Sequence, residues 1–328
     1  MKVRLGVRLA VGFAISVGAV LLLVRVVDVP ATVALLGSID PVWLALPLVA
    51  LGVQLVIRAW RWAFLLTVAS ATTVPTRRVV APLTVGYFVN AVLPARLGEV
   101  ARAVLVARRE HLPIGSVAAS VVVERVVDLA ALLLIGLLAT AALGAVGWPA
   151  LALAGGLIVG LGVVVYVAPL IADRLPRRLP ERARIVIGHF LGGIAAVDRR
   201  AFAGALLLSA VAWLGDVTTF WACARALGVD LGLPAVATIA VGAALGTALP
   251  AASGYLGTYE LGAVAIGSIA GTNPDSILAI AVLAHVVAVV PIALVGMVSA
   301  VRLGVRFTMP AADDDAAGAT ATADARRA

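Results

Sequence analysis

The sequence has little charge and few of the residues that build soluble catalytic or metal sites. Of its 328 residues, 13% are charged and 5% are aromatic, and there is one cysteine, Cys223. Lys2 is the only lysine. A single cysteine excludes an internal disulfide and a multi-cysteine metal site.

Long apolar runs take up most of the chain instead. Hydrophobic residues make up 63% of it and the mean hydropathy is +1.13, which is too apolar for a soluble globular protein. Several runs are close to or above the roughly 18 uncharged residues that mark a transmembrane helix. The sequence therefore predicts an all-α, polytopic integral membrane protein.

The positive charges lie in short loops between the apolar runs. The net charge of +8 comes almost wholly from arginine. In a soluble protein this excess would suggest nucleic acid as a partner, but between membrane spans it is the bias of cytoplasmic loops. Such loops also attract anionic lipid headgroups. We therefore expect membrane lipids, and no nucleic acid, as partners.

The order of basic and cation-free loops predicts the topology of the first part. The first run, Val7–Val27, follows a basic N-terminus and should leave the cytoplasm. We interpret it as a retained span and not as a signal peptide, because no small-residue cleavage site follows it. The loop Asp28–Pro41 is then external, and the second span, Val42–Leu66, returns to a basic flank.

Two apolar runs are too short to cross a bilayer. Val79–Leu93 stops at Pro94, and Val236–Leu249 stops at Pro250. Each is shorter than the roughly 20 apolar residues that a crossing helix needs. Short, proline-interrupted segments in corresponding halves are typical of transporter substrate sites. We predict two re-entrant helical hairpins, with eight full spans as the alternative.

The remaining runs complete an inverted repeat. Four further spans are predicted, at about Gly115–Leu143, Ala150–Ile171, Ala201–Ala224 and Ser276–Val301. The order span, span, hairpin, span then occurs twice, giving six full spans in a membrane domain over residues 1–308. Its inverted halves lie at about 7–143 and 150–302. We expect a multi-pass protein of the cytoplasmic membrane, with both termini cytoplasmic and a disordered tail over 309–328.

Two arginines lie inside the second span. Arg58 and Arg61 are three residues apart and share a helical face, with Trp60 and Trp62 beside them. One interpretation is an interfacial belt, in which these side chains reach the headgroup region. The other is a phosphate clamp, because arginine binds phosphate through paired hydrogen bonds. The sequence leaves both open.

Three charges follow the break after the first short run. They are Arg96, Glu99 and Arg102. Glu99 and Arg102 are three residues apart, so one interpretation is an ion pair that only stabilises the tip. We favour a functional role, in which Arg96 meets an anionic headgroup and Glu99 orients Arg96, helped by exposed N–H groups of the tip.

The third span carries Glu124, Arg125 and Asp128. A charge at the bilayer centre costs at least about 2.5–3.5 kcal/mol, so such residues face a cavity or a partner. Glu124 and Asp128 share a face and would repel each other, whereas Arg125 is expected to point elsewhere. We expect Arg96 or Arg102 between them. We favour this network over a catalytic carboxylate pair, because no nucleophile or metal motif accompanies it.

The fifth span and the second tip supply further candidates. Asp216 is the only charge inside the fifth span, and a functional and a purely structural role are both open. Glu260 follows the second tip, where Gly254 and Gly257 allow close backbone approach. By inverted symmetry we expect Glu260 to face the first tip in a functional role. For His285, alone on an apolar span, we favour a buried histidine with its hydrogen bonds satisfied over a proton relay.

These candidates fall into four motifs: Asn90-x-x-Leu93-Pro94-x-Arg96-x-Gly98-Glu99-x-x-Arg102, Glu124-Arg125-x-x-Asp128, Arg58-x-x-Arg61-Trp62 and Pro250-x-x-x-Gly254-x-x-Gly257-x-x-Glu260. Together they resemble the membrane region of lysylphosphatidylglycerol synthases and their stand-alone relatives, over roughly residues 5–305. The resemblance implies a flippase-like domain. In two-domain members a following cytoplasmic domain makes the aminoacylated lipid. Because this sequence ends soon after the last span, we do not expect lysyl transfer.

The resemblance and the motifs together predict movement of a lipid across the membrane. The expected cargo is an anionic phospholipid, a glycolipid or a polyprenyl-linked lipid, carried through a polar cavity between the hairpin tips. The implied headgroup-binding residues are Arg58, Arg61, Asn90, Arg96, Glu99, Arg102, Glu124, Arg125, Asp128, Asp216, Gly254, Gly257 and Glu260. No cofactor, metal or enzymatic activity is expected. Movement would be downhill or coupled to an ion, because no ATP-binding loop ending in Gly-Lys-Ser or Gly-Lys-Thr is present.

Two other classes of function stay open. One is an intramembrane transferase that acts on lipid-linked sugars. The other is a non-catalytic membrane partner of a glycosyltransferase or another lipid-modifying enzyme. The sequence also leaves open which lipid is bound, the direction of movement and whether the chain forms a homo-oligomer.

Overall fold

A computed structural model describes residues 2–94, 96–145, 155–156, 160, 180–249 and 251–305. Of residues 2–10 it describes the backbone only. The span predicted at Ala150–Ile171 and the tail predicted over 309–328 lie outside the described residues.

Every regular element in the described residues is a helix, which confirms the predicted all-α class. The first half contains α1 (Lys2–Val26), α2 (Val29–Leu36), the 3-10 turn η1 (Pro41–Leu44), α3 (Ala45–Ser70), α4 (Thr76–Val92), α5 (Leu97–Arg109) and α6 (Ile114–Ala142). The second half contains α8 (Glu181–Ala195), α9 (Arg199–Ala226), α10 (Leu233–Gly246), η2 (Ser253–Tyr255), α11 (Thr258–Gly267), η3 (Ser268–Ala270) and α12 (Pro274–Arg302).

Three described helical segments are long and apolar enough to cross a membrane. They are Pro41–Ser70, Arg199–Ala226 and Pro274–Arg302. A fourth candidate is the pair Val11–Val26 and Val29–Leu36, which is bent by 94° at the break between α1 and α2. The six spans and the alternative of eight therefore both remain predictions.

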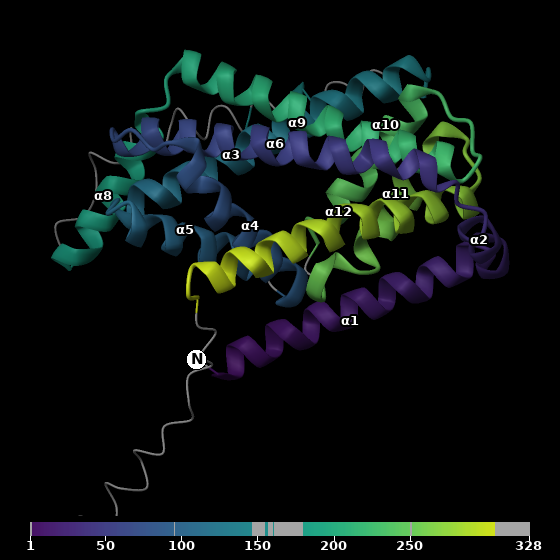
Figure 1. The fold of residues 1–328 in the computed structure, drawn as a ribbon, viewed down its shortest axis with the longest axis horizontal. Coiled ribbons are helices and arrows are strands. Elements are labelled where there is room, and N and C mark those ends of the chain that lie inside the picture. Colours follow the sequence, from purple (N-terminus) through teal and green to yellow (C-terminus); the bar gives the residue numbers. More distant parts are fainter. Residues whose placement is uncertain are drawn as a thin grey trace, which may run out of the picture.

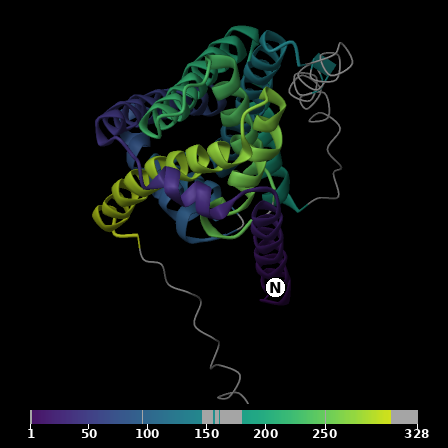
Figure 2. The ribbon, with the colours of Figure 1, turned by 90° about the vertical axis from the view of Figure 1, so that its right-hand side faces the viewer.

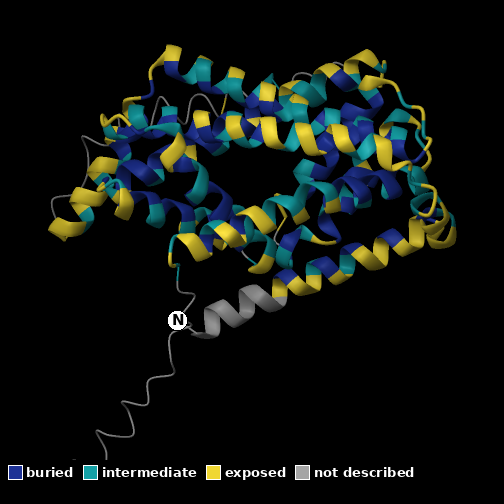
Figure 3. Ribbon diagram, in the orientation of Figure 1, coloured by how far each residue is buried: buried dark blue, intermediate teal, exposed yellow. Residues whose placement is uncertain are grey.

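The molecule has apolar side chains on its outside and charges within. Phe13 and Leu207 are each 65% exposed, and most of the yellow outward faces in Figure 3 belong to long apolar helices. By contrast, Arg61 is 0% exposed and Glu124 is 1% exposed. In water, a protein would expose its charges and bury its apolar side chains. Apolar side chains outside and charges inside suit a lipid bilayer, because apolar groups face hydrocarbon without cost whereas charges do not.

Each short run folds back on itself through glycine contacts. In the first hairpin, α4 and α5 approach so closely that a side chain on Gly98 would overlap the carbonyl oxygen of Gly86. The amide N–H of Gly98 donates to the side chain of Asn90 at 2.8 Å. In the second hairpin, α10 and α11 meet in the same way at Gly242 and Gly262. Small residues let two helix backbones touch, which is how helices pack in membranes.

The two hairpins lie in opposite halves of the bundle. Figure 1 shows α4 and α5 towards one end of the long axis and α10 and α11 towards the other. Helix α4 packs against α12, α10 packs against α6, and α3 packs against α9. Helix α1 runs along the outside of the bundle, where it contacts α11 (Figures 1 and 2).

The loops of different charge lie at opposite ends of the helix bundle. At one end, the amide of Asp40 donates to the carbonyl of Ala226 at 2.8 Å, and the amide of Asp28 donates to Asp275 at 2.7 Å. At the other end, Arg78 and Glu110 form a 2.8 Å ion pair. The cation-free loop predicted to be external thus lies with other loops at one end, and the basic flanks of the first hairpin lie together at the other.

We predict that Gly98→Ala destabilises the protein. The added methyl group would overlap the Gly86 carbonyl, and overpacking of this kind costs about 1–3 kcal/mol or more in the free energy of unfolding. Thermal unfolding in detergent measures the loss. Gly52→Ala in α3 is the matched control, because its methyl group would meet no atom within 4 Å. Equal melting temperatures for the two variants would contradict the hairpin packing.

Candidate functional site

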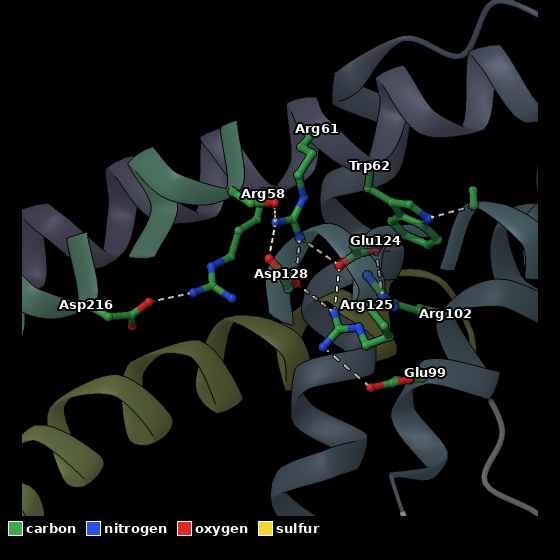
Figure 4. A network of polar contacts seen from close by, with 11 residues as sticks. Arg58, Arg61, Trp62, Glu99, Arg102, Glu124, Arg125, Asp128 and Asp216 are labelled. Carbon is green, nitrogen blue, oxygen red and sulfur yellow. Dashed lines mark hydrogen bonds and ion pairs between the residues drawn. The ribbon is translucent and has the colours of Figure 1, made fainter. Parts of the chain in front are cut away.

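A buried ion network lies where α3, α5, α6 and α9 meet (Figure 4). Arg61 of α3 is at its centre. Its guanidinium donates to both carboxylates of α6, reaching Glu124 at 2.9 Å and also Asp128. It donates as well to the Ser209 hydroxyl of α9, at 2.6 Å. A side chain that is 0% exposed cannot serve as an interfacial belt, so this interpretation of Arg61 is wrong.

Two further arginines converge on Glu124. Arg102 of α5 donates to one carboxylate oxygen at 2.9 Å, and Arg125 donates to the other at 2.8 Å. Arg125 also lies 3.4 Å from Asp128 and 3.7 Å from Glu99. The expectation that Arg125 points elsewhere is therefore wrong. Two arginines contact both carboxylates, Arg61 of another helix and Arg125. Of the two expected partners, Arg102 binds Glu124, whereas Arg96 donates to Thr247.

The network is electrically balanced. Three arginines face three carboxylates: Arg61, Arg102 and Arg125 against Glu99, Glu124 and Asp128. Buried charges persist only when they are paired and hydrogen-bonded, and here each has an opposite charge within reach. The guanidinium of Arg102 stacks on the ring of Trp62, with its central carbon 4.4 Å from the ring centroid. The indole N–H of Trp62 donates to the Ser120 hydroxyl at 3.2 Å.

Arg58 forms a separate pair. Its guanidinium lies 2.7 Å from Asp216 of α9 and 5.2 Å from the ring centroid of Trp213. Both charged side chains are partly exposed, and together with Gln54 and Tyr87 they line a pocket of their own. Asp216 is thus the partner of an arginine.

The tips of the two hairpins touch. Arg96 of the first tip donates to the carbonyl of Thr247 at the end of the second hairpin, and its guanidinium carbon lies 5.6 Å from the ring centroid of Tyr255. Arg96 and Tyr255 have φ values of 54° and 61°, a left-handed conformation that is rare for residues other than glycine. Such backbone strain persists where the surroundings hold it in place, which is common at functional sites.

Arg96 is the surplus charge of the site. Among the described residues its partners are a carbonyl and an aromatic ring, and neither neutralises a cation fully. Every arginine of the network, in contrast, has a carboxylate partner.

A cavity of about 180 Å³ opens between the tips and the network. Its charged lining consists of three arginines and one carboxylate: Arg96, Arg102, Arg125 and Glu99. Among the described residues, one terminal nitrogen of Arg102 and the Nε atoms of Arg125 and Arg61 are buried without a hydrogen-bond partner, and Arg102 and Arg125 line the cavity. Unsatisfied donors on two arginines beside a cavity suit an acceptor-rich anion such as phosphate.

An apolar groove adjoins this cavity. It has a volume of about 480 Å³ and lies between α1, α11 and α12. It shares Ala91, Gly254 and Val289 with the lining of the polar cavity. A cationic cavity that continues into an apolar groove matches a molecule with an anionic head and a hydrocarbon tail.

Glu260 lies on the wall of the groove and binds His285 at 2.6 Å. Its second carboxylate oxygen accepts the N–H of Gly257 at 2.8 Å. The other ring nitrogen of His285 donates to the carbonyl of Gly254 at 2.8 Å. His285 therefore has both hydrogen bonds satisfied, as predicted.

The structure brings most predicted site residues together. Arg61, Arg102, Glu124, Arg125, Asp128 and Glu99 form the network, and Asn90 and Arg96 line the cavity with Gly254. Gly257 and Glu260 lie in the groove, and Arg58 and Asp216 form their own pair. Sequence reasoning missed Ser209, Thr247 and Tyr255, because no spacing rule links them to the charged motifs.

These features define an all-helical membrane protein with a polar site between two helical hairpins. Residues 9–296 match the family described as the lysylphosphatidylglycerol synthase TM region, and the chain belongs to that family. The family assignment confirms the resemblance that the motifs indicated.

Two named proteins are similar to most of the chain. One is "Glycosyltransferase AglD" of Haloferax volcanii, with 30% identity over 86% of this chain and 52% of that protein. This chain thus spans about half the length of that relative, 52% of it. The other is a "UPF0104 membrane protein" of Methanothermobacter thermautotrophicus, with 26% identity over 83% of this chain and 87% of that protein.

We predict that Arg61→Ala unfolds or strongly destabilises the protein. It would leave Glu124 and Asp128 buried with too little positive charge, and breaking a buried ion pair costs about 3–5 kcal/mol. Chemical unfolding in detergent measures the change. Arg78→Ala removes an arginine that is 55% exposed from its pair with Glu110, which is 11% exposed. The loss should be smaller than for Arg61 and nearer the about 0–1 kcal/mol of surface pairs, because water reaches this arginine. Similar losses for both variants would contradict the central position of Arg61.

Proposed function

We propose that this protein translocates an anionic lipid across the cytoplasmic membrane through the cavity between its hairpin tips. The observation that carries the proposal is the junction of a cationic cavity with an apolar groove. The cargo would be an anionic phospholipid, a glycolipid or a polyprenyl-linked lipid. All three share a charged or polar head and a long apolar tail.

The headgroup binds between the tip arginine and the network. Arg96 supplies the charge that no described carboxylate neutralises, and Arg102 lies on the cavity wall with its guanidinium held by Glu124. Arginine binds phosphate through two parallel hydrogen bonds, which favours this residue type for the task. Glu99, Glu124 and Asp128 hold the arginines in place, so they act on the headgroup through their partners.

The hydrocarbon tail stays in an apolar environment throughout. The groove beside α1 and α12 offers such an environment next to the polar cavity. The polar head, in contrast, would meet a penalty of several kcal/mol in hydrocarbon without partners. A protein that shields only the head therefore removes most of the barrier to translocation.

The proposed architecture is a pair of inverted halves with both termini in the cytoplasm. Packing supports it, because each hairpin lies against the last helix of the other half: α4 against α12, and α10 against α6. Equivalent helices α3 and α9 also pack against each other. In many secondary transporters an inverted repeat of this kind has its site where the two halves meet.

Labelling of single cysteines tests this topology in a Cys223→Ser background. Ser38→Cys, in the cation-free loop, should react in intact cells with a membrane-impermeant maleimide. Thr73→Cys and His111→Cys, on either side of the first hairpin, should react only after the membrane is opened. Reaction of Thr73→Cys and His111→Cys from opposite sides would rule out a re-entrant first hairpin.

Lipid movement is tested in proteoliposomes with a fluorescent anionic lipid and a membrane-impermeant quencher. Wild-type protein should make the inner-leaflet lipid accessible, and Arg96→Ala should slow this by at least about tenfold, since a lost charge–phosphate contact is worth about 1.5–3 kcal/mol.

Arg225→Ala is the matched control for Arg96→Ala. Arg225 also stacks on an aromatic ring, Trp221, but it pairs with Asp230 and lies away from the cavity. It should move lipid at the wild-type rate. Equal rates for Arg96→Ala and Arg225→Ala would contradict a headgroup site at the tips. No lipid movement with any probe, including a polyprenyl phosphate, would contradict translocation itself.

A second candidate function follows from the name of one relative. Because the Haloferax volcanii protein is called a glycosyltransferase and this chain matches about half of it, 52%, the chain could serve as the membrane partner of such an enzyme or act as a lipid–sugar transferase. Both alternatives predict that the purified chain leaves the labelled headgroup in its original leaflet in the same proteoliposomes.

A further inference from the structure

Glu260 and His285 form a buried pair that the proposed binding of a headgroup does not use. They are 7% and 6% exposed, on α11 and α12 respectively. The ring of Tyr259 covers the imidazole, with ring centroids 4.3 Å apart. Both side chains also bind the backbone of the second tip, at Gly254 and Gly257. The pair therefore connects a long helix to the segment that contributes Gly254 and Tyr255 to the cavity wall.

The hydrogen bonds fix the number of protons on the pair. A carbonyl only accepts, so Nε2 of His285 must donate to Gly254 and must carry a proton. Oε2 of Glu260 accepts the N–H of Gly257. The 2.6 Å contact between Nδ1 and Oε1 then requires a second proton between the two atoms, because two lone pairs at that distance repel. The pair thus holds one proton more than a neutral imidazole and a carboxylate would.

Loss of one proton leaves a single N–H on the imidazole for two acceptor oxygens. The N–H stays on Nδ1 beside the carboxylate, so a lone pair of Nε2 then faces the Gly254 carbonyl and that contact breaks, while a net negative charge remains in apolar surroundings. Such a charge is costly unless water or a partner reaches it. Relief requires movement of the second tip, because Gly254 and Gly257 are the other partners of the pair. Both glycines have positive φ values, 68° and 84°, so the tip adopts a conformation that these bonds help to hold.

The movement would reach the headgroup cavity directly. Gly254 lines both the cavity and the groove, and a side chain there would lie against the Ala91 carbonyl of the first hairpin. Tyr255, the next residue, stacks on Arg96. A second tip that moves away from the first therefore frees Arg96 and opens the cavity.

The ionisable neighbours of the pair are few. On the elements that pack against α11 and α12, the described ionisable side chains in the inner part of the bundle are Arg58 and Arg61 of α3, Tyr87 of α4, Asp216 and Cys223 of α9, and Tyr255 of η2. Nearer the ends are Arg25 of α1, Arg77 and Arg78 of α4, Arg199, Arg200 and Arg225 of α9, and Asp275 and Arg302 of α12. In the described chain, only Tyr259 among the ionisable side chains contacts the pair.

We propose that Glu260 and His285 form a proton-binding site that couples proton release to opening of the second tip. This inference rests on the proposed function and names its coupling ion. With the shared proton bound, the tips stay closed; when the proton leaves to water, the tip opens. The only covalent bond that breaks is an N–H bond of the imidazole, and its proton goes to water, so no other reactant is needed. One proton is released for each opening.

Proteoliposomes with a transmembrane pH difference test the coupling. If one proton moves with each lipid, a difference of about one pH unit should drive the labelled lipid towards about a tenfold excess in one leaflet. A tenfold ratio corresponds to about 1.4 kcal/mol, both for protons across the membrane and for lipid between the leaflets. Glu260→Gln and His285→Gln should give no excess beyond that of protein-free liposomes. Tyr259→Phe keeps the ring and removes only the hydroxyl, so it should behave as wild type.

The outcomes separate the two proposals. Wild-type protein that equalises the lipid between leaflets but builds no excess under a pH difference would overturn proton coupling and leave translocation intact. Wild-type protein that moves no lipid with or without the pH difference would overturn translocation. An excess that persists in both Glu260→Gln and His285→Gln would overturn the assignment of the proton to this pair.

Magnetic resonance tests the proton site without any transport. In a His111→Gln, His189→Gln background, His285 is the only histidine, because the chain has three. With ¹⁵N-labelled histidine, the protein should show a strongly downfield proton resonance that correlates with Nδ1, as expected for a short hydrogen bond. Glu260→Gln should remove this resonance and leave the Nε2–H signal. A bare Nδ1 with no such proton in the wild-type pair would overturn the proposal.

Discussion

The sharing of Glu124 among three arginines is the interaction on which the rest of the site depends. It ties α3, α5 and α6 together around a carboxylate that is 1% exposed and depends on these arginines for compensation of its charge. Removing any one partner leaves a charge without compensation, so the helices are held in one arrangement. The first hairpin is anchored to this network through Arg102, which fixes the base of the tip that carries Arg96.

A fixed base and a less constrained tip suit a site that must bind and release. The network balances its own charge and its core of Arg61, Glu124 and Asp128 is buried, whereas Arg96 depends on a carbonyl and a ring, both contributed by the second hairpin. The second tip in turn is held by Glu260 and His285, which lie outside the network. The rigid part therefore defines where the headgroup binds, and the two tips define when it has access.

Much of this could be predicted from the sequence, because the bilayer restricts the choices. Long apolar runs and two proline breaks predicted the helices near their observed ends, and charges inside spans indicated the site. The partners could not be predicted. Spacing along α6 placed Glu124 and Asp128 on one face, but whether Arg61, Arg96 or Arg102 reached them depended on the packing of distant helices. The glycine contacts within each hairpin could not be predicted either, because they depend on how the backbones of two helices are placed relative to each other.

The charge balance of the network has an electrical consequence. Voltage acts on a protein only through net charge that moves along the membrane field, at about 2.3 kcal/mol per charge for each 100 mV. Arg61, Arg102 and Arg125 with Glu99, Glu124 and Asp128 sum to zero, so the network can shift as a unit without sensing the membrane potential. Arg96 and a bound phosphate cancel in the same way. While Glu260 and His285 keep their shared proton, an occupied site would therefore be electrically silent, and an empty one would carry the charge of Arg96 alone.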